Sequence, residues 1–173
     1  MQTMNRQERR AQARAAKAKP SKRRVPSLDT MSLATKQAVA LTPGEVAAIV
    51  NPSRQALAAL RQGTSVADDY SLLAGVLTAS IGIERKGVVK GFSEVIFAAS
   101  DALKALVERA MESGEWRPPT LYGHEITAVD DLLHWHEYQL KHLSYAEYHA
   151  ALRSVNEELK RDGVDVQVNG IYE

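Results

Sequence analysis

The stretch LTPGEVAAIVNPSRQALAALRQG, residues 41–63, decides the fold that this sequence predicts. Its first half carries the signals of a helix start. Thr42 is a typical N-cap residue, Pro43 follows at the first helical position, and Glu45 completes a capping box. Apolar side chains then recur at helical spacing, which predicts one buried face.

The middle of the same stretch carries a signal that ends a helix. In Asn51-Pro52 the proline has no N–H, and its ring disfavours helical geometry in the residue before it. Ser53 is a plausible cap for a new helix, and Gly63 is a natural terminator. We therefore expect residues 41–63 to form two short helices around a tight break.

Two short helices with this spacing resemble the helix-turn-helix module of DNA-binding proteins. The resemblance covers 23 residues and rests on Leu41-Thr42-x-x-Glu45-Val46-Ala47 before the turn and on Ser53-Arg54-Gln55 after it. It implies that the second helix faces DNA, where arginine pairs with guanine edges or phosphates and glutamine pairs with adenine. The residues that it assigns to DNA are Ser53, Arg54, Gln55 and Arg61. The alternative is an ordinary helical hairpin that buries Val46, Ile49, Leu57 and Leu60.

Positive charge is concentrated at the N-terminus. Residues 1–24 hold nine Lys or Arg against one acid, a net +8, whereas the whole chain has a net charge of +1. We expect residues 1–27 to form a flexible basic arm that contacts the phosphates of DNA or RNA, an acidic protein surface, or nothing beyond solvent. The residues assigned to phosphate contacts are Arg6, Arg9, Arg10, Arg14, Lys22, Arg23 and Arg24.

The remaining chain predicts an all-α bundle. Residues 28–163 are expected to form one domain of four or five main helices, followed by a short extended tail at 164–173. Helices are predicted at 41–63 (as a hairpin), 66–84, 92–112, 125–143 and 145–162, with the last two forming an antiparallel pair. The helix at 66–84 is apolar nearly all round and belongs in the middle of the bundle, where Gly75 and Gly82 let a neighbour approach closely.

Composition and motifs exclude several functional classes. The 173 residues contain no cysteine, which removes thiol chemistry and disulfides, and no apolar run approaches the roughly 20 residues of a membrane helix. No nucleophile or metal-binding motif is present, so we expect no catalytic residue, cofactor or metal. The buried seam of the helix at 125–143 includes His136, which we interpret as a core histidine hydrogen-bonded to a neighbour.

The chain as a whole also resembles a group of small, uncharacterised proteobacterial proteins that are often borne by phages or plasmids and sometimes carry a regulator label. The matching stretches include residues 52–63 and Leu121-Tyr122-Gly123. The sequence thus predicts a cytoplasmic, non-enzymatic DNA-binding protein with a regulatory or accessory role. The alternative is a protein-interaction or structural protein whose arm docks on a partner. Its helical seams would also suit a homodimer.

Overall fold

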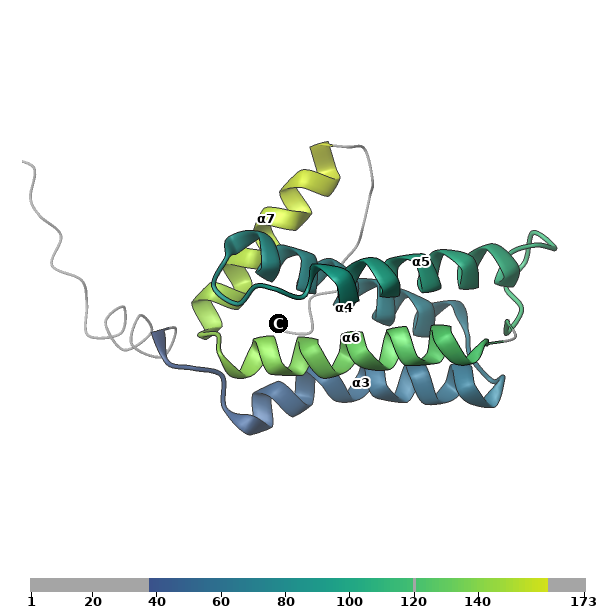
Figure 1. Ribbon diagram of the computed structural model, residues 1–173, viewed down its shortest axis with the longest axis horizontal. Helices are drawn as coiled ribbons and strands as arrows, with labels where there is room; N and C mark the ends of the chain where they lie inside the picture. The colour runs from purple at the N-terminus through teal and green to yellow at the C-terminus, as the bar shows by residue number, and fades with distance from the viewer. Residues whose placement is uncertain (1–37, 120, 162–173) are drawn as a thin grey trace, which may run out of the picture. The chain divides into compact units, whose positions relative to one another are not determined.

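The computed structural model describes residues 38–119 and 121–161, which all belong to a compact unit spanning Ala34–Glu173. The basic arm predicted at 1–27 and the tail predicted at 164–173 lie outside the described residues. Within them the chain is all-α, as predicted, and the only β-type pairing is a single bridge between Ala40 and Ser144. Figure 1 shows the helices α3 (Pro43–Gln62), α4 (Ala67–Lys86), α5 (Ser93–Ala110), α6 (Gly123–Lys141) and α7 (Tyr145–Arg161).

The prediction of two short helices in residues 41–63 is wrong. α3 is one continuous helix of 20 residues that contains Pro52 in its interior. Its two ends agree with the sequence signals. Thr42 and Glu45 form the capping box, and Gly63 ends the helix in a left-handed conformation with φ of 68°.

Packing explains why Pro52 does not break α3. Proline removes the hydrogen bond to the carbonyl of Ala48, at a cost of about 3 kcal/mol in a helix interior, but Ala48 is exposed and its carbonyl can bond water. The buried residues of α3 lie on both sides of the proline and form one continuous face. Each buried Val or Leu contributes about 1.5–3 kcal/mol, so covering the whole face outweighs the lost hydrogen bond. These buried residues are Val46, Val50, Ser53, Ala56, Leu57 and Leu60.

α4 is the central helix, as its nearly uniform apolar surface predicted. It packs against α3, α5, α6 and α7. Gly82 makes the closest approach: a Cβ atom on it would lie 2.6 Å from Cγ2 of Val155 and 3.0 Å from the carbonyl oxygen of Ala151. The absence of a side chain at residue 82 therefore lets α7 lie against α4. Gly75, which was expected to have the same role, has no comparably close neighbour.

The predicted antiparallel pairing of the last two helices is also wrong. Both helices form, and Ser144 and Glu147 cap α7 through reciprocal hydrogen bonds. However, α7 packs chiefly along α4, while α6 packs between α3 and α5 (Figure 1). Because α3 and α5 already cover the flanks of α6, α7 does not pair with α6. It packs against α4, where Gly82 allows a close approach.

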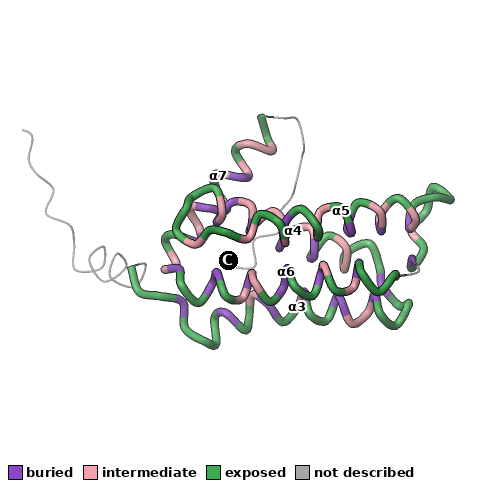
Figure 2. The backbone as a smooth tube through the Cα atoms, viewed as in Figure 1, coloured by how far each residue is buried: buried purple, intermediate pink, exposed green. Residues whose placement is uncertain are grey.

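A buried polar layer divides the interior of the bundle. One apolar cluster lies among α3, α4, α5 and α6, and a second joins the start of α3 and the end of α4 to the α6–α7 turn. Four of the six buried polar residues lie on helices between the two clusters, and Figure 2 shows the buried positions along each helix. They are Ser53 on α3, Ser80 on α4, and His136 and Gln139 on α6.

Candidate nucleic-acid interface on α3 and α6

The two arginines that the sequence assigned to DNA lie on α3 and face α6. Arg54 donates a hydrogen bond to Glu137 and forms an ion pair with it, and Arg61 lies 3.3 Å from the carboxylate of Asp130. Both arginine side chains remain partly exposed, at 51% and 44%. A phosphate group that approached either arginine would therefore also approach a carboxylate.

Glu137 holds two cations at once. Its other carboxylate oxygen lies 2.8 Å from the amine of Lys141, one helical turn further along α6. The hydrogen bond from Lys141 is the main cause that lowers the pKa of Glu137, and the charge of Arg54 lowers it further. Glu137 is thus ionised at neutral pH and adds a fixed negative charge between α3 and α6.

The other two assigned residues do not extend this surface. Ser53 is buried at 3% exposure in the polar layer, because the helix is continuous and places it on the packed face. Gln55 is exposed on α3. The structure thus brings Arg54, Gln55 and Arg61 to the surface, but it does not present them at the start of a separate helix.

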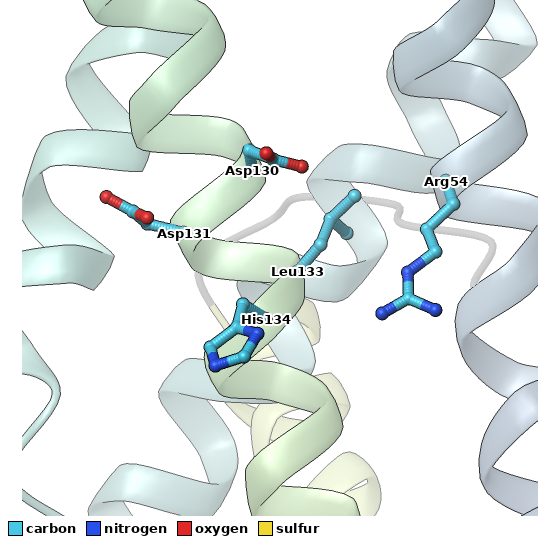
Figure 3. Close-up of a pocket in the computed structure, with 5 residues that line it drawn as sticks. All are labelled: Arg54, Asp130, Asp131, Leu133 and His134. Atoms are coloured by element: carbon cyan, nitrogen blue, oxygen red, sulfur yellow. The ribbon is translucent and has the colours of Figure 1, made fainter.

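A pocket of about 220 Å³ lies at the same place. Figure 3 shows the Arg54 guanidinium extending from α3 toward α6, Asp130 directed to the α3 side, and Asp131 directed to the opposite side. Leu133 and His134 complete the lining. One cation against two carboxylates makes this pocket unsuited to a phosphate.

An aromatic cluster, which the sequence reasoning did not identify, lies on the other side of α6. Phe92, just before α5, stacks on Trp135 with ring centroids 4.5 Å apart and meets the edge of Tyr138 at 5.8 Å. Tyr138 in turn lies 4.3 Å from the ring of His142. The helical spacing of 134, 138 and 142 was visible in the sequence, but the contribution of Phe92 depends on how α5 packs.

One further acid, Glu125, is fixed at the start of α6. Burial alone would raise its pKa, but hydrogen bonds from Arg109 at 2.6 Å and from the backbone N–H of Tyr122 at 3.0 Å outweigh burial and leave the pKa lowered. The side chain of Glu125 is only 3% exposed. This ion pair joins α5 to α6 and has a structural role.

The described surface offers neither a metal site nor a membrane segment. Within residues 38–119 and 121–161, no three His, Asp or Glu side chains are grouped so that they could hold a metal ion. None of the helices there combines the length and the apolar character needed to cross a bilayer.

Charge is distributed unevenly between the described residues and the N-terminus. The described residues include 12 Lys or Arg and 16 Asp or Glu, a net charge of −4. The basic residues assigned to phosphate contacts between Arg6 and Arg24 lie outside the described residues. Comparison with family models, curated proteins and solved structures gave no match for this chain. The functional argument therefore rests on the chain's own residues.

Proposed function

We propose that this protein is a non-enzymatic DNA-binding protein with a regulatory or accessory role, and that its basic N-terminal arm supplies the affinity. The observation that carries the proposal is the charge separation: net +8 in residues 1–24 against net −4 in the described helices. A run of cations nearly free of acids neutralises successive phosphates and releases their counterions, which requires no fixed fold in the arm.

The pairing of the α3 arginines supports an arm-centred mechanism. Arg54 and Arg61 each face a carboxylate of α6, so DNA that approached α3 would also meet Glu137 and Asp130. Like-charge juxtaposition of this kind opposes binding. The helical bundle therefore acts as the scaffold that carries the arm, and α3 does not select a base sequence.

Salt dependence tests this proposal. If the arm neutralises about six phosphates, the affinity for a duplex falls by about three orders of magnitude when salt rises fourfold, from about 50 to 200 mM. The measurement is fluorescence anisotropy with labelled duplex DNA, and with RNA of equal length, using the full chain and a variant lacking residues 1–24. The proposal fails if the full chain does not bind DNA at the lower salt concentration, or if the shortened chain binds DNA equally well.

A second candidate function, binding of a protein partner without catalysis, is favoured by the exposed apolar side chains. Phe97 is 69% exposed on α5, and Val88 and Met111 near the two ends of that helix are 48% and 43% exposed. A large aromatic side chain as exposed as Phe97 is a candidate anchor for a partner, because aromatic residues are enriched in interfaces. Under this alternative the arm docks on an acidic protein, and neither DNA nor RNA binds at the lower salt concentration.

A further inference from the structure

The outward surface of α6 has no neighbouring helix in the described part of the chain. We call the exposed residues Asp130, Asp131, His134, Tyr138, Lys141 and His142 the α6 outer face. Among the described helices, α3 packs along one flank of α6 and α5 along the other, so this face is left uncovered. Tyr138, near its middle, is 42% exposed.

Acidic, aromatic and basic side chains succeed one another along this face. Two carboxylates, Asp130 and Asp131, lie toward the start of α6. Lys141 and His142 lie toward its end, and the rings of His134 and Tyr138 lie between the two groups. One half of the face is thus acidic and the other half carries an amine and an imidazole.

Contacts with the flanking elements fix which side of the face each charged group occupies. Asp130 pairs with Arg61 of α3, and Lys141 pairs with Glu137, which itself contacts Arg54 of α3. Asp130 and Lys141 therefore lie on the α3 side.

The other two polar groups of the face lie on the α5 side. Asp131 points away from α3 in Figure 3, and His142 contacts Tyr138, which contacts Phe92 at the start of α5. Each side of the face thus has an acid at the end of the face nearer the N-terminus of α6 and a nitrogen base at the other end.

This arrangement is self-complementary under a twofold axis. An axis that lies in the contact plane and crosses α6 near residue 136 keeps each side of the face opposite the same side of the second copy. It places Asp130 opposite Lys141, Asp131 opposite His142, and His134 opposite Tyr138. Every acid then faces a base, and aromatic rings meet at the centre.

We propose that two copies of this protein associate through the α6 outer face, with the two α6 helices antiparallel. The contact is small: residues 130–142 span about 18 Å at 1.5 Å per residue, which puts the buried area at the low end for specific interfaces. The dimer is therefore reversible and salt-sensitive, with a dissociation constant in roughly the micromolar range. It would also join two basic arms in one particle, although the proposal does not depend on DNA binding.

Charge reversal gives a sharp test by sedimentation velocity. The wild-type protein is expected to shift from monomer to dimer as its concentration rises from about 1 to 200 µM. In D130K/D131K the face carries only basic groups, and in K141D/H142D only acidic groups apart from His134, so each variant alone should remain monomeric. An equimolar mixture of the two should form a dimer, because each carboxylate of one variant then faces a lysine or the imidazole of His142 in the other.

A matched control separates this face from a general effect of charge. D101K/E108K makes the same change on exposed positions of α5 and should dimerise like the wild type, with circular dichroism showing that all variants keep their helices. The proposal is overturned if the wild type stays monomeric throughout, if D130K/D131K dimerises like the wild type, or if the mixture of the two reversed variants stays monomeric.

Discussion

The Nδ1 atom of His136 lies 2.9 Å from the hydroxyl oxygen of Ser80, and both residues are buried between the two apolar clusters of the bundle. This contact joins α6 to α4 across 56 positions of the chain. Burial is the main cause that lowers the pKa of His136, to about 4, although the neighbouring side chain of Gln139 partly offsets it. The imidazole is therefore neutral in the folded protein at every pH above about 4.

The buried imidazole makes the stability of the bundle depend on pH. The unfolded chain takes up a proton at His136 below the ordinary pKa of 6.5, whereas the folded protein does so only below about 4. Stability is thus lost as pH falls from 6.5 toward 4, by about 2 kcal/mol between roughly pH 7 and pH 5. Urea unfolding at both pH values measures this loss.

His136→Asn is the control for this effect. Asparagine keeps a hydrogen-bonding group near the Nδ1 position but cannot take up a proton, so the variant is less stable at both pH values and loses less between them. Carboxylates whose pKa is lowered by folding also stabilise the protein, but that stabilisation is lost only below their ordinary pKa of 4.5. It therefore does not contribute to the change between roughly pH 7 and pH 5. An equal pH dependence in the wild type and the variant would contradict the role of His136.

Replacing Pro52 tests the continuity of α3. In Pro52→Ala the new N–H can donate to the carbonyl of Ala48, so we expect the free energy of unfolding to rise by about 2 kcal/mol after allowing for the more flexible unfolded chain. Pro43→Ala is the control, because proline is well tolerated at a helix start and little change is expected there. Chemical denaturation measures both. A less stable Pro52→Ala protein would mean that the chain needs a break at this position.

Two glycines of α4 should respond in opposite ways to the same substitution. Gly82→Ala places a methyl group against Val155 and the backbone of Ala151, and we expect a loss of about 1–3 kcal/mol. A Cβ atom on Gly75 would meet no atom of another helix within 4 Å, so Gly75→Ala should gain about 0.5–1 kcal/mol from helix propensity. Thermal unfolding of the two variants gives the comparison. Equal shifts in the two melting temperatures would contradict the close packing of α7 at residue 82.

Local signals in the sequence were enough to predict the two ends of α3 and the all-α class. The capping box of Thr42 and Glu45, the terminator Gly63 and the buried position of His136 all depend on residues within a few positions of one another. The continuity of α3 through Pro52 could not be predicted in this way, because it depends on packing against α4 and α6.

The candidate site was harder to predict for a similar reason. The sequence indicates Arg54 and Arg61 as candidate binding residues. Their partners Glu137 and Asp130, however, belong to a helix far along the chain. Arg54 and Glu137 are 83 positions apart. No local sequence pattern indicates such a pairing. Because of it, the two arginines form ion pairs with α6 and do not make a basic surface on α3.

The most direct test of the proposed function compares two variants, one that lacks two positive charges of the N-terminal arm and one that lacks two positive charges of α3. We expect R23A/R24A to weaken binding to duplex DNA and to lower the slope of log affinity against log salt by about 2, because each arginine neutralises a phosphate. R54A/R61A removes the same charge from α3 and should leave both the affinity and the slope unchanged within about twofold. The opposite result, with binding lost in R54A/R61A and kept in R23A/R24A, would contradict the account.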